Sequence, residues 1–246
     1  MNIDLSSPTL RYGIGCFETL RFEPPNRILF LREHCERLSI GAGICRINCL
    51  PVSEMIELTR RVVACQDFRS PKVLRLILTP ETGLSLLHED LSIRPEQIKL
   101  IISEQFHYPA YSSLSVFKSF NYLAPYLAGQ SAKQVGADGS LMLNAADPDQ
   151  IVCAHNGNLF FLDEEGFWHT PALSSGCLPG VIRALLVLFL RAEERRINLS
   201  ELKRFKGAIL TNSLIDARSV HQIGTQNFTP LNLKPILDYL SRLSLK

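Results

Sequence analysis

Residues 174–183 have the sequence Ser-Ser-Gly-Cys-Leu-Pro-Gly-Val-Ile-Arg (SSGCLPGVIR), and this stretch decides how the second half of the chain is interpreted. Pro179 and Gly180 stand directly before an apolar run, and a proline at this place is typical of a helix start. The first N–H groups of a helix lack partners within it, and the helix dipole is positive there, so this end attracts phosphate groups. The stretch therefore predicts a helix from Pro179 to Arg195 that begins at an anion site, although a plain helix start has the same pattern.

One lysine lies among aromatic residues ahead of this helix, in the segment FKSFNYL at residues 117–123. Phe117 and Phe120 flank Lys118, and Tyr122 follows four residues after it. A lysine amine that is shielded from water becomes a better nucleophile. The local pattern therefore indicates either a reactive amine or an ordinary surface lysine.

Three further segments complete an ordered set: YGIGCFET at residues 12–19, HCERL at residues 34–38 and NLF at residues 158–160. Their order and spacing resemble class IV aminotransferase-fold enzymes. In that family the corresponding segments are YGDGxFET, HxxRL, a lysine followed by NYL, NxF and SSxxLPGITR. Thr211-Asn212-Ser213 is similar to a further turn of the same family.

The resemblance implies that pyridoxal 5'-phosphate (PLP) is bound through a Schiff base to Lys118. PLP needs a lysine amine, an anion site for its phosphate and a group that tunes its pyridine nitrogen. The resemblance assigns the phosphate to the backbone N–H groups of Val181 and Ile182. The other cofactor-binding residues that it implies are Arg37, Thr211 and Asn212 at the phosphate and Tyr122 at the phenolic oxygen.

The chain departs from the family at the pyridine nitrogen. A glutamate normally stands five residues before the asparagine of NxF, and this chain has Cys153 there. A neutral thiol does not stabilise a protonated ring as a carboxylate does. Transamination moves the substrate's negative charge fully into the ring, whereas elimination expels a leaving group and needs a weaker electron sink. Cys153 therefore favours a lyase over an aminotransferase.

Composition limits the classes of partner. The chain has 246 residues, 46% hydrophobic and 20% charged, with a formal net charge of +2, which does not indicate binding to nucleic acid or to an anionic membrane. The number of cysteines is odd at seven, and no CxxC pair occurs, which fits reduced thiols in a cytosol. No metal is expected, because the spacing of Cys45 and Cys49 matches no common zinc pattern. Residues 1–10 lack the apolar core of a signal peptide, so we expect a cytoplasmic protein.

The order of elements predicts an α/β chain of the α+β type with two lobes, which the resemblance identifies as PLP fold type IV. Strands are expected at 17–22, 28–31, 73–78, 98–102, 141–143, 151–152, 158–162, 167–170 and 208–211, and helices at 32–43, 54–65, 122–135, 179–195 and 235–243. Strict βαβ alternation is absent, which argues against a Rossmann sheet. A polar, aromatic segment at 108–115 is the predicted linker. It separates an N-terminal lobe at 1–107 from a C-terminal lobe at 116–246 that carries Lys118 and the phosphate site.

The expected activity is that of a 4-amino-4-deoxychorismate lyase, which forms 4-aminobenzoate and pyruvate for folate synthesis. In this role Lys118 holds PLP, removes the α-proton of the substrate and returns a proton to the pyruvate product. The alternatives are a D-amino acid or branched-chain aminotransferase, and a PLP-binding protein with little or no activity. The family also implies a homodimer.

Overall fold

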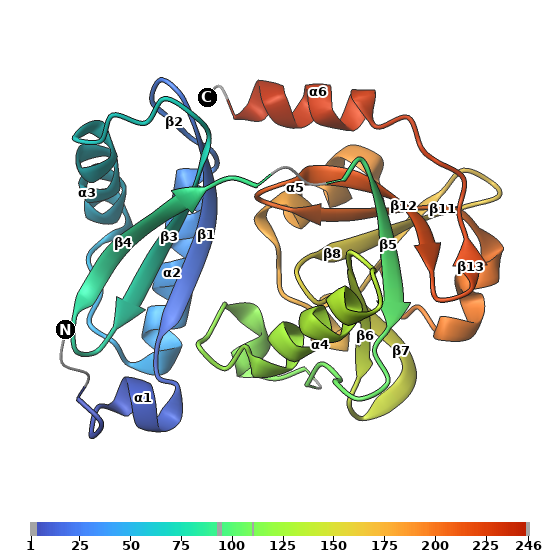
Figure 1. Ribbon diagram of the computed structural model, residues 1–246, viewed down its shortest axis with the longest axis horizontal. Coiled ribbons are helices and arrows are strands. Elements are labelled where there is room, and N and C mark those ends of the chain that lie inside the picture. Colours follow the sequence, from blue (N-terminus) through green and yellow to red (C-terminus); the bar gives the residue numbers. More distant parts are fainter. Residues whose placement is uncertain (1–3, 93–94, 110, 245–246) are drawn as a thin grey trace. The chain divides into compact units, whose positions relative to one another are not determined.

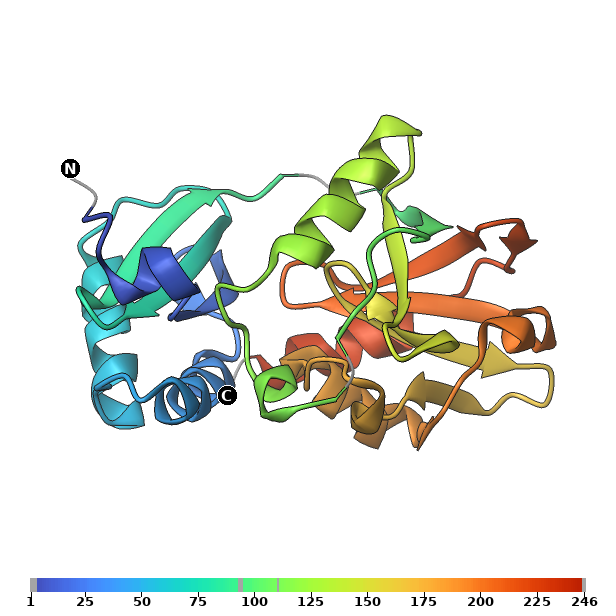
Figure 2. The same cartoon turned by 90° about the horizontal axis from the view of Figure 1, so that it is seen from below.

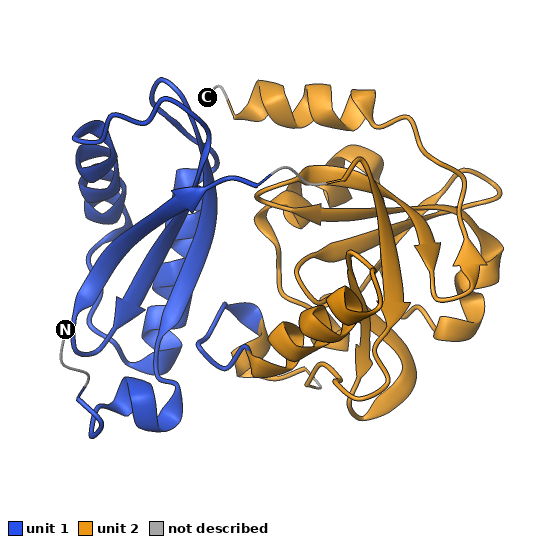
Figure 3. Cartoon of the chain, viewed as in Figure 1, with its two compact units in different colours: residues 1–93, 116–122 blue, residues 94–115, 123–246 orange. Residues whose placement is uncertain are grey.

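The computed structural model describes residues 4–92, 95–109 and 111–244. Met1–Ile3 and Ala110, which belong to the predicted N-terminal segment and linker, lie outside the described residues. The chain forms two compact units, one of residues 1–93 and 116–122 and the other of residues 94–115 and 123–246 (Figure 3). The segment that carries Lys118 thus folds with the N-terminal unit, whereas the predicted lobes place it with the C-terminal one.

The first unit is an antiparallel sheet with helices, and its strand order is β2-β1-β3-β4. Its strands are β1 (Cys16–Glu23), β2 (Arg27–Ile28), β3 (Lys72–Thr79) and β4 (Gly83–Asp90), and its helices are α1 (Pro8–Tyr12), α2 (Leu31–Cys45) and α3 (Val52–Ala64). Helix α2 packs on β1, and α3 packs on α2. Side chains of β1 alternate between buried and half-buried, with Cys16, Leu20 and Phe22 directed into the core.

The second unit is built on a mixed sheet of nine strands, ordered β10-β9-β8-β11-β12-β5-β6-β7 with β13 paired to β12. Its strands are β5 (Gln97–Ile102), β6 (Gly139–Asn144), β7 (Asp147–Ala154), β8 (Asn158–Asp163), β9 (Trp168–Pro171), β10 (Glu193–Arg195), β11 (Phe205–Asn212), β12 (Asp216–Ile223) and β13 (Gln226–Asn227). The sheet curls, and β7 contacts both β8 and β9. Apolar residues of β5, β6, β7, β8, β11 and β12 form a shared core.

Helices cover this sheet at separate places. They are α4 (Leu123–Gln134), α5 (Val181–Leu190) and α6 (Lys234–Leu243), with short 3-10 turns at Ser113–Val116, Leu173–Ser175 and Leu199–Arg204. Helix α4 packs on β6, α5 on β11 and α6 on β12 (Figure 1). Phe189 of α5 stacks on Tyr239 of α6 with ring centroids 4.2 Å apart, whereas α4 lies apart from both helices (Figure 2).

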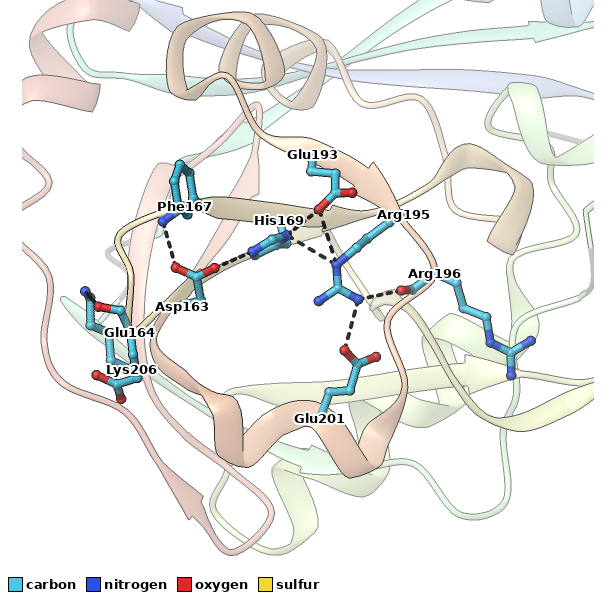
Figure 4. A network of polar contacts seen from close by, with 9 residues as sticks. All are labelled: Asp163, Glu164, Phe167, His169, Glu193, Arg195, Arg196, Glu201 and Lys206. Carbon is cyan, nitrogen blue, oxygen red and sulfur yellow. Dashed lines mark hydrogen bonds and ion pairs between the residues drawn. The ribbon is translucent and has the colours of Figure 1, made fainter.

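A polar network joins β8, β9 and β10 at one edge of the sheet (Figure 4). His169 Nε2 lies 2.8 Å from the Asp163 carboxylate, and His169 Nδ1 lies 3.0 Å from that of Glu193. Arg195 Nη1 donates to Glu201 at 3.0 Å. These contacts stabilise the parallel pairing of β9 with the short β10.

Several predicted elements were wrong in extent. The helix predicted over 179–195 ends at Leu190, because Arg191 adopts a positive φ of 50° and caps it, and the following residues form β10. The strand predicted over 28–31 is only Arg27–Ile28, since Leu31 begins α2. Helix α2 continues past the predicted end at Gly43. The helix predicted over 122–135 begins at Leu123, so Pro125 lies in its first turn, where a proline is tolerated.

Candidate active site

The segment around Lys118 runs antiparallel to the beginning of β1 and forms backbone hydrogen bonds with it. Phe17 donates its N–H to the Lys118 carbonyl at 2.9 Å, and Phe120 donates to the Gly15 carbonyl at 3.1 Å. Cys16 and Ser119 form an antiparallel bridge between these bonds. The backbone of Lys118 is therefore fixed to the beginning of the strand, on the side opposite to its partner β3.

The Lys118 side chain lies between the aromatic rings of Phe17 and Tyr122. Its Nζ donates to the Tyr122 hydroxyl at 3.2 Å, and it lies 4.8 Å from the Phe17 ring centroid and 4.4 Å from that of Tyr122. Phe17 and Tyr122 meet edge to face, with centroids 5.7 Å apart. The two rings orient the amine and shield it partly from water.

Two aromatic residues anchor this segment against glycines. A Cβ on Gly41 of α2 would lie 2.7 Å from the Phe117 ring, and a Cβ on Gly15 would lie 2.8 Å from the Phe120 ring. Phe117 is buried in the core of the first unit. Gly41 thus occurs inside α2 because the Phe117 ring occupies the space of a side chain.

Arg37 is buried and paired with Glu18. Arg37 Nε donates to Glu18 Oε1 at 2.7 Å, and Arg37 Nη2 donates to Glu18 Oε2 at 2.6 Å. His34 Nδ1 lies 2.6 Å from the same Oε2. Glu18 comes from β1, whereas His34 and Arg37 lie three residues apart on one face of α2. Arg37 is therefore not an exposed helix residue.

The pKa values in this triad follow from burial and charge. Burial alone would raise the pKa of Glu18, but the Arg37 guanidinium and His34 lower it to about 2. Burial lowers the pKa of His34 below its ordinary value. At neutral pH the triad thus consists of a carboxylate, a guanidinium and a neutral imidazole that donates through Nδ1.

The helix predicted to begin at Pro179 starts two residues later. Helix α5 starts at Val181 after Gly180, and the Gly180 carbonyl accepts its first intrahelical bond, from Ala184. Asn158 Nδ2 donates to the Leu178 carbonyl at 2.9 Å, and a Cβ on Gly180 would lie 2.2 Å from Asn158 Oδ1. Asn158 therefore fixes the chain that leads into α5, and a side chain at position 180 would displace the Asn158 amide.

Thr211 and Asn212 lie at the end of β11, beside β8. The Thr211 hydroxyl donates to the Asn158 carbonyl at 3.4 Å. Asn212 Oδ1 accepts from the N–H groups of Leu214 and Ile215, and its Nδ2 donates to the Asn156 carbonyl at 3.0 Å. These side chains therefore hold the turn that follows β11.

Cys153 is buried in β7. It packs with Val152 and Cys177, and Tyr108 and Leu173 lie against this cluster. Position 153 thus combines a small side chain with an apolar environment.

The predicted site residues divide between the two units. Arg37, Lys118 and Tyr122 belong to the first, and the second contains Cys153, Val181, Ile182, Thr211 and Asn212. Glu18, His34 and Asn158 were assigned no role from the sequence, although each stands in a quoted motif. Their partners are distant in sequence, and this is why the motifs alone did not reveal them.

Among the described residues, no cluster of three or more histidine, cysteine, aspartate or glutamate side chains is arranged to hold a metal ion. No helix found there has the length and apolar character to cross a membrane.

Comparison with known proteins identifies the family. The model of the amino-transferase class IV family matches residues 15–223. Branched-chain-amino-acid transaminase 1 of Bacillus subtilis is 23% identical over 235 residues, which are 82% of this chain and 65% of that protein. The chain therefore spans less than two thirds of the length of this curated relative.

Solved structures share the fold. The branched-chain aminotransferase of Thermoproteus uzoniensis superposes with a TM-score of 0.87 at 21% identity, over 99% of this chain and 90% of that one. A candidate 4-amino-4-deoxychorismate lyase of Legionella pneumophila superposes with a TM-score of 0.84 at 24% identity, over 99% and 94%. The chain belongs to the class IV aminotransferases, a family of enzymes whose cofactor is PLP.

Proposed function

We propose that the chain is a PLP-dependent 4-amino-4-deoxychorismate lyase, which converts its substrate into 4-aminobenzoate and pyruvate. The observation that carries this choice is Cys153 at the position of the family's glutamate, in an apolar cluster. The likeness in fold to the Legionella pneumophila protein is consistent with it.

The residues of the chain fit PLP. The Lys118 amine is oriented by Tyr122, a charged Arg37 is held in place by two hydrogen bonds, and α5 begins with N–H groups at a glycine. These match the amine and the anion site that PLP requires. In the proposed site Lys118 binds PLP covalently, and Tyr122 contacts its phenolic oxygen. The proposed phosphate ligands are Arg37 and the backbone at Val181, Ile182, Thr211 and Asn212.

Bound PLP supplies an electron-withdrawing ring that acidifies the substrate carbon bearing the amino group. Lys118 Nζ would remove the proton from this carbon, a ring double bond would form, and the bond between the neighbouring ring carbon and the ether oxygen would break. Nζ would then return the proton to the released three-carbon enol, which becomes pyruvate. Tyr122 keeps Nζ directed at that proton, because its hydroxyl is the hydrogen-bond partner of the amine. Phe17 shields the amine from water on one side.

Cys153 decides between elimination and transamination in this proposal. Cys153 offers the pyridine nitrogen no carboxylate to stabilise its protonated form, so the ring is a weaker electron sink than in relatives with the glutamate. Asp147, an acid at the start of the same strand, pairs with Arg196 instead. Elimination can proceed with a cofactor ring that withdraws electrons less strongly, and formation of the aromatic ring of 4-aminobenzoate adds driving force.

Branched-chain aminotransferase is the second candidate function. The relative in Bacillus subtilis and the neighbour in Thermoproteus uzoniensis both carry that name. Turnover separates the two candidates. Purified protein with PLP should release 4-aminobenzoate from 4-amino-4-deoxychorismate faster than it transfers amino groups from leucine or valine to 2-oxoglutarate. The reverse order of rates would refute the lyase.

We also propose that the chain works as a cytoplasmic homodimer, as the family resemblance implies. Light scattering coupled to size exclusion should give twice the chain mass of 27.6 kDa. A monomeric mass in the active preparation would contradict the dimer.

A further inference from the structure

Glu18, His34 and Arg37 form a buried polar cluster that contains an ion pair, beside the hydrophobic core of the first unit. Glu18 is 1% exposed, His34 0% and Arg37 8%, between β1 and α2. Burying an ion pair costs desolvation that its attraction does not always recover, and apolar replacements of such pairs are often as stable. Removing one member would destabilise the fold, but apolar residues at all three positions could be as stable, so stability alone does not explain why these residues are present.

The geometry restricts how Arg37 can move. Its Nε and Nη2 both bond to Glu18, which fixes the guanidinium plane to the carboxylate plane. His34 Nδ1 bonds to the oxygen that receives Nη2, so the carboxylate itself is held from a second direction. A long side chain with many rotamers is thereby reduced to one orientation.

We propose that Glu18 and His34 are positioning residues, which orient Arg37 for the phosphate group of the cofactor. This inference rests on the proposed site, in which Arg37 binds that phosphate. It does not depend on whether the reaction is elimination or transamination. Glu18 and His34 touch neither cofactor nor substrate and act only through Arg37.

Helix α2 also connects Arg37 to the cofactor lysine. Gly41 lies one turn after Arg37, and the ring of Phe117 packs on Gly41. Phe117 is the residue directly before Lys118 in the sequence. One rigid helix thus sets the phosphate arginine and the anchor of the lysine segment relative to each other. A rigid arrangement of this kind lowers the entropy lost when a ligand binds both groups.

The test compares PLP with pyridoxal, which has the same aldehyde and no phosphate. Both compounds bind at Lys118, so damage to the lysine or to the fold weakens the binding of both. A misplaced Arg37 weakens the binding of PLP alone, because only PLP carries the phosphate. Dissociation constants are measured from absorbance changes for the wild type, Glu18→Gln, Arg37→Ala and the double variant. Glu23→Gln is the matched control, since Glu23 lies on the same strand and pairs with Arg21 and Arg27.

We expect Glu18→Gln to weaken PLP binding about 10-fold, the lower end of the loss that follows when a residue supporting a metal ligand is replaced. Pyridoxal binding should change less than twofold, and Glu23→Gln should bind both like the wild type. In the Arg37→Ala background, Glu18→Gln should cause no further loss, because its effect passes through Arg37. Equal weakening of PLP and pyridoxal, or unchanged PLP affinity, would overturn the inference.

Histidine variants test the same idea if Glu18→Gln does not fold. His34→Asn keeps a side-chain N–H donor near the place of Nδ1 and should retain PLP affinity, whereas His34→Leu removes the donor and should lose it selectively over pyridoxal. Identical PLP affinity in the two variants would count against positioning. Failure of the proposed site looks different, because then Arg37→Ala itself leaves PLP affinity unchanged, or PLP does not bind the wild type.

Discussion

Replacing Glu18 with glutamine should remove a pH-dependent part of the free energy of unfolding. The pKa of Glu18 is about 2 in the folded protein, against an ordinary 4.5, because Arg37 and His34 outweigh the effect of burial. This difference corresponds to about 3 kcal/mol of stability at neutral pH. Since the folded pKa is the lower one, the contribution is complete above pH 4.5 and is lost as the pH falls towards 2.

Urea unfolding of the cofactor-free protein, followed by circular dichroism from pH 7 to the lowest pH at which both proteins fold, measures this contribution. The wild type should exceed Glu18→Gln by about 3 kcal/mol near pH 7, and the difference should shrink below pH 4.5, where protonated Glu18 comes to resemble glutamine. His34 adds acid sensitivity at higher pH, because burial lowers its pKa from 6.5. Glu23→Gln, which alters a more exposed pair, should lose less than about 1 kcal/mol. A difference that is the same at pH 7 and pH 3 would refute the reasoning.

Three substitutions test the rest of the site. Arg37→Ala should weaken PLP binding by about 1.5–3 kcal/mol in an equilibrium titration, the value of a charge-assisted hydrogen bond, and unchanged affinity would remove Arg37 from the site. Gly180→Ala places a Cβ 2.2 Å from Asn158 Oδ1, so it should lower the free energy of unfolding in urea by about 1–3 kcal/mol and also weaken PLP binding. Gly43→Ala is the control, because its Cβ meets open space and should leave PLP affinity unchanged. Cys153→Glu should raise the rate of PLP conversion by amino acids more than the rate of 4-aminobenzoate release, and an equal gain in both rates would break the argument from cysteine to lyase.

Local sequence patterns predicted the strongly alternating or periodic elements well. β1, β3, α2 and α3 all lie within a few residues of the predicted ranges. β4 was missed, because its residues are half-buried or exposed and the second half, Leu87–Asp90, gives no core-facing pattern. β12 was also missed, since its polar and charged residues are paired through long-range contacts with β5 and β11.

Only those residues of the candidate site that belong to the family's sequence motifs could be predicted. The resemblance named Lys118, Tyr122 and Arg37, and these three fold into one unit. It did not indicate that Arg37 is paired with Glu18, because that bond joins a strand to a helix 19 residues later. The bond from Asn158 to Leu178 spans 20 residues and has the same character. Such pairs depend on tertiary packing, which no short pattern encodes.

The central claim is that PLP is held by Lys118, and borohydride reduction of the purified, PLP-loaded protein tests it most directly. Reduction makes the bond between cofactor and amine permanent, so that peptide mapping by mass spectrometry locates it. The account predicts the phosphopyridoxyl adduct on Lys118, in the peptide that contains Phe120 and Tyr122, and no adduct in Lys118→Ala. An adduct on another lysine, or covalent binding that persists in Lys118→Ala, would contradict it.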